Sequence, residues 1–163
     1  MSNPTTLEAL RRLEFFHDIA EDDLSRLAEI AREVEFPADS EMFHEYDTAR
    51  DVFAVVSGKV SIAVFTPKFG WRQLVEVGDG ELIGWSPLVG RDRLFDTARA
   101  ITPTKALAFD GRKLLDLCRE NPAFGFEFMH RAAKVLAQRL GATHSQLREI
   151  TGVKLPSEQL ESD

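Results

Sequence analysis

The chain has 163 residues, of which 44% are hydrophobic and 29% charged, values typical of a globular domain with a core of its own. Its net charge of −7 disfavours a nucleic-acid-binding surface, which needs a basic face, so we expect no nucleic-acid partner. The single cysteine, Cys118, excludes an internal disulfide, and no apolar run is long enough for a signal peptide or a membrane span; these features predict a cytoplasmic protein without membrane contact.

Residues 5–36 are predicted to be helical. In the segment 21–34 the apolar side chains recur at the i, i+3, i+4, i+7 spacing of an amphipathic helix. They are Leu24, Leu27, Ala28, Ile30, Ala31 and Val34. Pro37 is expected to end this helix, because proline has no N–H for the helical hydrogen-bond ladder.

From residue 36 to residue 109 the hydrophobic period changes to two. Short runs rich in Val, Ile and Phe alternate with Gly- and Pro-containing turns. The Ser57-Gly58 pair predicts a hairpin, and residues 67–70 and 78–80 predict further turns. Short strands at even spacing predict a small antiparallel barrel or sandwich.

Residues 111–150 return to the helical period, with Asn121 as a cap and Pro122 at the first position of a long helix. One set of residues on this helix recurs at alternating spacings of four and three, which is a heptad seam. It consists of Met129, Ala133, Leu136, Leu140, Thr143, Leu147 and Ile150.

A second apolar face of the same helix is predicted to pack on the barrel. It consists of Phe124, Phe128, Ala132 and Val135. Two apolar faces are hard to bury on one small barrel, so we expect a homodimer through the seam; the alternative is a helix that lies along its own domain. The whole is predicted to be a single α+β domain over residues 1–150, followed by a polar tail over residues 151–163.

The succession of helices, barrel and long helix resembles the cyclic nucleotide-binding domain of the catabolite activator and kinase regulatory-subunit superfamily, especially the Crp/Fnr sensor domains. The resemblance extends from Leu13 to Leu147. Its marker residues are Phe43, Asp47, Gly58, Gly70, Gly80, Gly84 and the stretch 97–100. The family fold that it implies is a cupin-like jelly roll. In such regulators a helix-turn-helix follows the long helix, and too few residues follow Ile150 here, so we expect the output to be self-association or a protein partner.

The resemblance also implies a phosphate-binding cassette in the loop that begins at Gly84. In the family a glutamate after the glycine holds the ribose, a small residue donates a backbone N–H to the phosphate, and an arginine pairs with the phosphate. Here Trp85, Pro87 and Leu94 occupy these three positions, and Phe95 follows. An indole is only a donor, proline has no N–H, and leucine has no charge, so cyclic AMP and cyclic GMP are expected to bind very weakly.

Three interpretations of this divergent loop stay open. The first is a sensor for a less charged small molecule, with Trp85, Leu94 and Phe95 as apolar lining beside Gly84 and with Ser86 as a polar group. The second is a pocket filled by its own tryptophan, which leaves a dimeric scaffold module. The third is a true cyclic nucleotide site in which Arg91 or Arg93 replaces the missing arginine.

No catalytic or metal-binding pattern is visible in the sequence. The stretch 84–88 begins like a nucleophile elbow but has Leu88 where the second glycine belongs. The four histidines have no metal-ligand spacing. They are His17, His44, His130 and His144. We therefore expect a non-enzymatic protein with neither a metal nor a cofactor.

Overall fold

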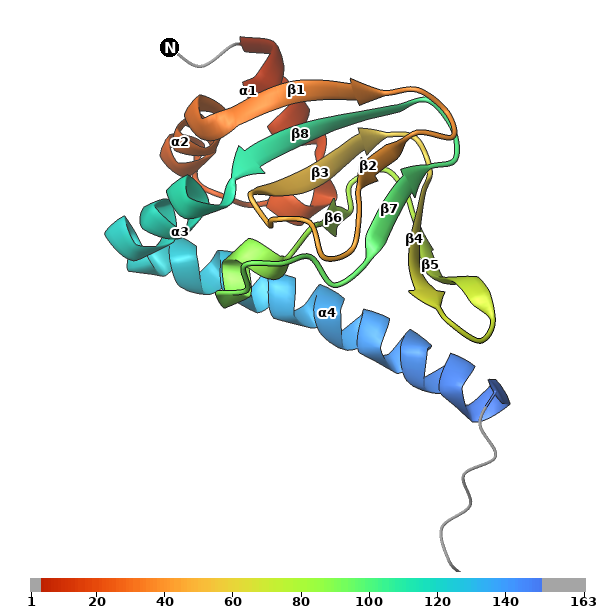
Figure 1. Ribbon diagram of the computed structural model, residues 1–163. Helices are drawn as coiled ribbons and strands as arrows, with labels where there is room; N and C mark the ends of the chain where they lie inside the picture. The colour runs from red at the N-terminus through yellow and green to blue at the C-terminus, as the bar shows by residue number, and fades with distance from the viewer. Residues whose placement is uncertain (1–3, 151–163) are drawn as a thin grey trace, which may run out of the picture.

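The computed structural model describes residues 4–150, which form a barrel of short strands with helices before and after it in the chain (Figure 1). The helices are α1 (Pro4–Arg12), η1 (Glu14–Phe16), α2 (Glu21–Ile30), η2 (Ser86–Val89), α3 (Gly111–Glu120) and α4 (Pro122–Ile150). The strands are β1 (Ala31–Phe36), β2 (Glu41–Phe43), β3 (Asp51–Ser57), β4 (Val60–Thr66), β5 (Gly70–Val77), β6 (Leu82–Ile83), β7 (Thr97–Ala100) and β8 (Thr104–Asp110).

The strands form two antiparallel sheets of four. One sheet has the order β1-β8-β3-β6 and the other the order β2-β7-β4-β5. With helices before and after the barrel, this is the jelly roll of the cyclic nucleotide-binding fold. The predicted α+β class and antiparallel barrel are thus confirmed.

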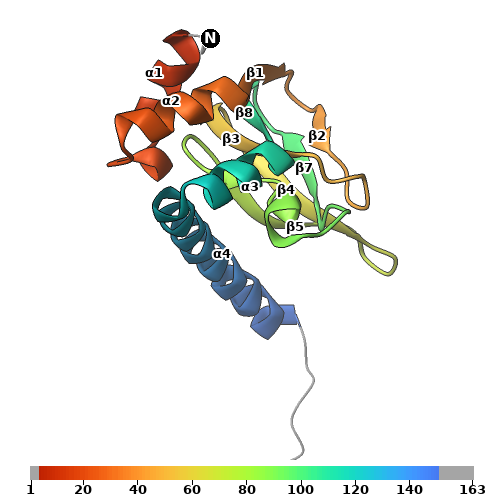
Figure 2. The ribbon, with the colours of Figure 1, turned by 90° about the vertical axis from the view of Figure 1, so that its left-hand side faces the viewer.

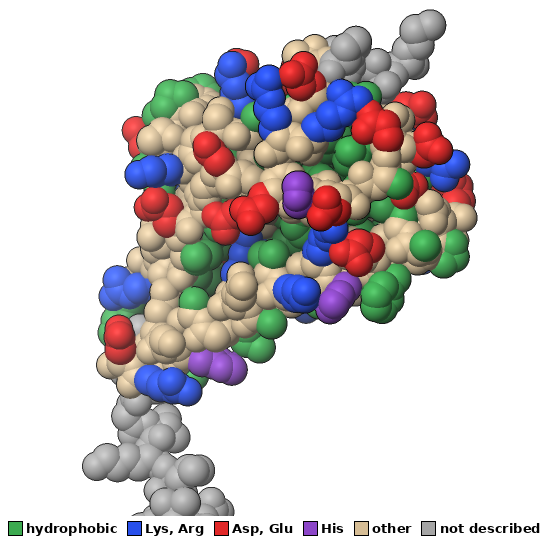
Figure 3. Space-filling view, turned by 180° about the vertical axis from the view of Figure 1, so that it is seen from behind, with side chains coloured by type: hydrophobic (Ala, Val, Ile, Leu, Met, Phe, Trp, Pro, Cys, Tyr) green, Lys and Arg blue, Asp and Glu red, His purple; other side chains and the backbone are tan. Residues whose placement is uncertain are grey.

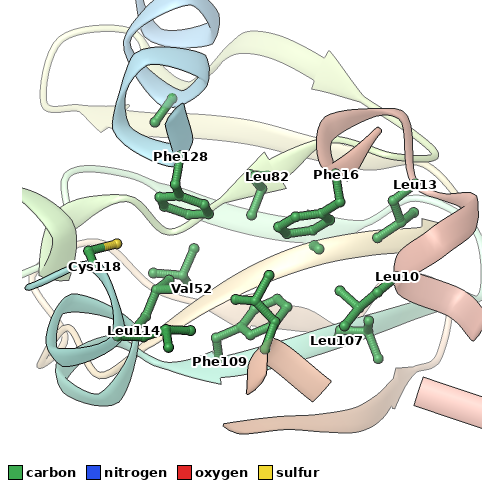
Figure 4. Close-up of a cluster of buried hydrophobic side chains, with 14 of the residues drawn as sticks. Leu10, Leu13, Phe16, Val52, Leu82, Leu107, Phe109, Leu114, Cys118 and Phe128 are labelled. Carbon is green, nitrogen blue, oxygen red and sulfur yellow. The ribbon is translucent and has the colours of Figure 1, made fainter. Parts of the chain in front are cut away.

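The sheet that contains β3 and β8 is buried on both faces, because successive side chains of a strand point to opposite sides. On β3, Val52 and Ala54 belong to a cluster shared with the helices, whereas Phe53 and Val55 belong to a second cluster inside the barrel. Figure 4 shows the helix-side cluster, where Phe16 and Phe128 lie over the sheet opposite Val52 and Phe109. The molecule therefore has two hydrophobic cores separated by one sheet.

The predicted helix over residues 5–36 is wrong in its last six residues. Residues 31–36 form β1, which pairs with β8 in a register that sets Ala31 opposite Phe109 and Val34 opposite Ala106. The segment Ala-Arg-Glu-Val-Glu-Phe fits a helical spacing at Ala31 and Val34, but pairing with the free edge of β8 decides its conformation. Pro37 thus follows a strand rather than a helix.

The predicted hairpin at Ser57-Gly58 is also wrong. Strands β3 and β4 are not paired with each other; the chain passes here from one sheet to the other. Gly58 has a φ of 121°, and a Cβ at this position would lie 2.5 Å from Oγ1 of Thr104. The glycine serves a tight crossing between sheets, whereas the predicted turn before Gly70 does join a hairpin, β4–β5.

The C-terminal helices follow the predicted pattern. Asn121 accepts a hydrogen bond from the N–H of Phe124 at 3.3 Å, as expected of the cap of α4. The second apolar face of α4 is packed on the core: Phe124, Phe128 and Ala132 are buried, and Val135 is half-buried. Cys118 of α3 is buried in the same cluster, and this burial raises the pKa of its thiol to about 11.

Helix α4 runs past one end of the barrel, from α3 to the neighbourhood of β5 (Figure 1). Near its C-terminal end Gln146 donates a hydrogen bond to the carbonyl of Leu74 at 2.6 Å. The view in Figure 2 shows that the other side of this helix is not covered by the other described helices and strands. The helix thus closes one end of the barrel and leaves a long surface exposed.

Candidate functional site

The divergent loop between β6 and β7 is shaped by two glycines with left-handed backbone. Gly84 follows β6 with a φ of 76°, and a Cβ here would lie 3.0 Å from the carbonyl oxygen of Asp51. The 3-10 helix η2 then begins directly after Trp85 and ends at Gly90, which has a φ of 72°. The loop therefore runs from a strand through a glycine turn into a short 3-10 helix.

A cavity of about 420 Å³ lies between this loop, the barrel and α4. Its wall is mainly apolar, with Ile62 and Val75 from the barrel and Trp85 and Leu94 from the loop. Helix α4 contributes Leu136, Arg139, Leu140 and Thr143. In the space-filling view of Figure 3, hydrophobic side chains gather in the hollow between the barrel and the long helix, with acidic side chains on the barrel surface above them.

Trp85 forms one wall of the cavity. Only 7% of it is exposed, and its ring belongs to the helix-side cluster, where it lies 6.3 Å from the ring of Phe15. Its indole Nε1 is buried and has no hydrogen-bond partner among the described residues. Since a buried donor without a partner is costly, Nε1 is a place where a bound acceptor would be stabilised.

The other predicted loop residues have different surroundings. Leu94 is buried in the cluster inside the barrel, at the position where the resemblance places the phosphate-binding arginine. Ser86 is buried and also lines the cavity. Phe95 is half-exposed at the rim, and the Arg91 guanidinium stacks 3.9 Å from the centre of its ring. Gly84, Trp85, Ser86, Leu94 and Phe95 thus all line the cavity, and their role in binding a ligand stays a prediction.

Arg93 is not where a replacement for the missing arginine was expected. It pairs with Thr48 in an isolated β-bridge, and its guanidinium faces the carbonyl of Tyr46 at 3.3 Å. Arg91 and Arg93 line a separate surface groove with Arg50 and Arg112. The next residue, Leu94, is buried inside the barrel instead.

Arg139 is the basic residue of the cavity, and the sequence did not predict it. It lies on α4, its Nη2 donates a hydrogen bond to the carbonyl of Leu82 at 2.5 Å, and its guanidinium lies 5.8 Å from the Trp85 ring centre. Its Nε is buried without a partner among the described residues. Its spacing of three residues from the seam residue Leu136 puts both on one side of the helix, but this spacing alone does not distinguish Arg139 from a solvated arginine.

Two charged groups of the cavity influence each other without forming an ion pair. Burial lowers the pKa of Arg139, and the negative charges of Glu81 and Asp96 oppose this shift. Burial raises the pKa of Asp96, and Arg139 opposes that shift. The guanidinium stays charged at neutral pH, because arginine is very basic even in proteins. The cavity thus presents a cation in an apolar environment.

The heptad seam and the cavity share residues. Leu136 and Leu140 line the cavity and yet remain 36% and 56% exposed, and Leu147 is 53% exposed. Met129 is half-buried against the helix-side cluster, whereas Ala133 and Thr143 are exposed. The side chain of Ile150 lies outside the part that the structure describes.

Over residues 4–150 the histidines, cysteine and carboxylates form no group of three or more that could hold a metal ion. Within the same range, no helix is both long and apolar enough to cross a membrane.

Among curated proteins, the chain is similar to transcriptional regulators. The chain is 24% identical over 149 residues to the "CRP-like cAMP-activated global transcriptional regulator" of Mycobacterium tuberculosis and 29% identical over 138 residues to the "HTH-type transcriptional regulator Cmr" of the same organism. These alignments cover 91% and 84% of the chain. The chain spans only 65% and 54% of the lengths of these relatives.

Solved structures share the fold. A cyclic nucleotide-binding domain from Methylobacillus flagellatus KT superposes with a TM-score of 0.78 at 20% identity, over 93% of this chain and 85% of that one. The catabolite activator protein of Thermus thermophilus superposes with a TM-score of 0.68 at 26% identity, over 83% of this chain and 62% of that one. The family model of the cyclic nucleotide-binding domain matches residues 33–121. The chain therefore belongs to the cyclic nucleotide-binding domain family.

Proposed function

We propose that this chain is a non-enzymatic, cytoplasmic ligand-sensing domain whose effector is a small organic molecule other than cyclic AMP or cyclic GMP. The observation that supports it is the cavity of about 420 Å³ between the barrel and α4, with Trp85 and Leu94 where the family resemblance places a glutamate and an arginine. Ligand pockets are mostly apolar with a few polar groups that fix orientation, and this cavity has that character.

The cavity also favours a sensor over a self-filled scaffold module. Trp85 packs into the helix-side cluster and forms a wall, and the space beside it stays open between β-barrel and helix. Of the described residues that line this space, Arg139 is the one basic side chain. The two arginines of the loop, Arg91 and Arg93, line the separate groove instead, which supports a ligand other than a cyclic nucleotide.

A neutral fluorescent probe, N-phenyl-1-naphthylamine, tests whether the cavity takes up a ligand. We expect its fluorescence to rise on binding to the wild-type protein. Leu140→Trp should abolish the rise, because Leu140 lines the cavity and the larger ring would fill it. The matched control is Leu147→Trp, on the same face of α4 but outside the cavity lining, which should leave binding intact. No rise with wild type would contradict the proposed function.

Calorimetry with cyclic AMP and cyclic GMP tests the negative part of the proposal. The relative that is cAMP-activated by name suggests the opposite outcome, so the measurement discriminates. We expect no heat of binding at micromolar concentrations, since three groups of the cassette are missing and each charge-assisted hydrogen bond contributes about 1.5–3 kcal/mol. The double variant Pro87→Ala, Leu94→Arg restores a backbone donor and the arginine and should gain affinity. Micromolar binding by wild type would show that other residues hold the phosphate.

The second part of the proposal is assembly as a homodimer through α4. A protein partner would then recognise the dimer. It is supported by the exposed leucines of the seam, Leu136, Leu140 and Leu147, on a helix with one uncovered side (Figure 2). Exposed apolar side chains in a row on one helix face are typical of an interface.

A further inference from the structure

The cavity contains a cation that forms no ion pair with any carboxylate of the described residues. Arg139 makes one hydrogen bond there, to the carbonyl of Leu82, and no carboxylate among the described residues lies within ion-pair distance of it. Asp96 lines the same cavity and attracts the guanidinium without contacting it. Buried charges in proteins are normally paired, so this arrangement is unusual unless a ligand completes it.

Two residues that line the cavity also have a buried donor that lacks an acceptor among the described residues. Nε of Arg139 and Nε1 of Trp85 are both buried without a hydrogen-bond partner among the described residues, and both residues line the cavity. The two side chains adjoin, since the guanidinium lies 5.8 Å from the centre of the indole ring. An indole N–H and a guanidinium can only donate, so the missing partner must be an acceptor. With a cation beside it, an anionic acceptor is favoured.

The rest of the lining selects an apolar body. Ile62, Val75, Leu94 and Leu136 surround the space, and its volume of about 420 Å³ falls within the range of small-molecule sites, about 300–1,000 Å³. A carboxylate offers two oxygens to a guanidinium in matching geometry. A phosphodiester would need further donors, and Pro87 removes the backbone N–H that the family resemblance assigns to it.

We propose that the effector is an apolar carboxylic acid, of the size of a medium-chain fatty acid or an aryl-alkanoic acid, whose carboxylate binds Arg139 and the indole N–H of Trp85. This inference rests on the proposed ligand-sensing function and adds the chemical class of the ligand. Asp96 then limits the affinity, because its negative charge lies close to the bound carboxylate and repels it.

Displacement of N-phenyl-1-naphthylamine tests the chemical class separately from the existence of the site. The competitors are matched pairs: octanoate against 1-octanol, and 4-phenylbutyrate against 4-phenyl-1-butanol. We expect each acid to compete at a concentration at least about tenfold lower than its alcohol, because only the acid pairs with the guanidinium. Arg139→Met should remove this preference while leaving the alcohols unchanged.

Two further variants distinguish recognition from a merely structural role of Arg139. Trp85→Phe keeps the aromatic wall but deletes the N–H, so it should lower the affinity for the acids and leave the affinity for the neutral probe unchanged. Asp96→Asn removes a repelling charge and should raise the affinity for the acids, whereas damage to the site would lower it. The carboxylate assignment would be overturned if acids and alcohols competed equally, or if Arg139→Met kept the preference for acids. Neither result would contradict ligand binding in the cavity. A wild-type protein that does not bind the neutral probe at all would overturn the proposed function, and this inference with it.

Discussion

Among single residues, Trp85 and Leu94 explain best why this chain differs from the family resemblance. Each stands in the cassette position of a charged ligand-binding residue, and each is buried in a different hydrophobic cluster. Trp85 adds its ring to the helix-side cluster, and Leu94 adds its side chain to the barrel interior. In both positions a side chain that packs in a hydrophobic cluster thus stands where the family resemblance places a charged one. Gly84 and Gly90 supply the left-handed backbone that the loop needs.

The two glycines of the loop provide a matched test of how its backbone is held. Both have positive φ values, 76° at Gly84 and 72° at Gly90, so Ala at either position has the same left-handed strain of about 1–2 kcal/mol. Only at Gly84 does the added Cβ also meet a carbonyl oxygen, that of Asp51 at 3.0 Å; at Gly90 nothing lies within 4 Å. We expect Gly84→Ala to lower the free energy of unfolding by at least about 1 kcal/mol more than Gly90→Ala. Urea denaturation with equal m-values is the measurement, and equal losses would show that the close approach to β3 is relaxed without cost.

At the level of elements, β1 and α4 show opposite relations between sequence pattern and structure. The pattern of residues 31–36 is compatible with both a helix and a strand, and pairing with β8 selects the strand. The pattern of α4 is unambiguous over many turns, and the helix forms as predicted. Its seam, however, has two roles that the heptad spacing does not show, because Leu136 and Leu140 both line the cavity and remain partly exposed.

The α4 seam predicts a dimer that one charge should disrupt. We expect light scattering to give twice the chain mass for the wild-type protein and the single chain mass for Leu147→Asp, because a carboxylate would be buried at the interface without a partner. Leu147 lies outside the cavity lining, so this variant does not alter the site.

Ala142→Asp is the control, since Ala142 is exposed and lies on the opposite side of the helix from Leu140. It should leave the dimer intact. A monomeric wild type at high concentration, or a dimeric Leu147→Asp, would contradict assembly through this seam.

For the molecule as a whole, the cavity lies at the junction of two parts that are far apart in the chain. The barrel and its loop form one side, and α4 forms the other, with Arg139 bonded to Leu82 across 57 residues of sequence. Leu136 and Leu140 belong to both the cavity and the seam. Under the proposed assembly, a ligand that fits one state of the helix better than another would therefore shift the dimer equilibrium.

The charge of the whole chain gives a prediction about nucleic acid. With a net charge of −7, the 163-residue chain should not bind duplex DNA at an ionic strength of about 0.15 M, where phosphate contacts by basic residues dominate affinity. Fluorescence anisotropy of a labelled duplex is the measurement, with a titration at low salt to reveal non-specific attraction. Binding that persists at the higher salt and depends on the DNA sequence would contradict this expectation.

The sequence by itself determined the features that depend on residue identity and local period. Alternation of apolar residues predicted the barrel strands, and the period of α4 predicted the long helix. The residues after Gly84 predict very weak binding of cyclic nucleotides, and this stays a prediction. An indole cannot accept, a proline cannot donate and a leucine cannot neutralise charge wherever the fold places them, so this conclusion needed no coordinates.

The tertiary structure alone decided which elements meet. It made residues 31–36 a strand, turned the Ser57-Gly58 pair into a crossing between sheets, and set Arg93 outside the cavity. It also brought Arg139 into the cavity beside Trp85, although nothing in the local pattern distinguishes this arginine from a solvated one. The physical reason is that burial and pairing are properties of contacts between distant segments, whereas periodicity and side-chain chemistry are properties of each segment on its own.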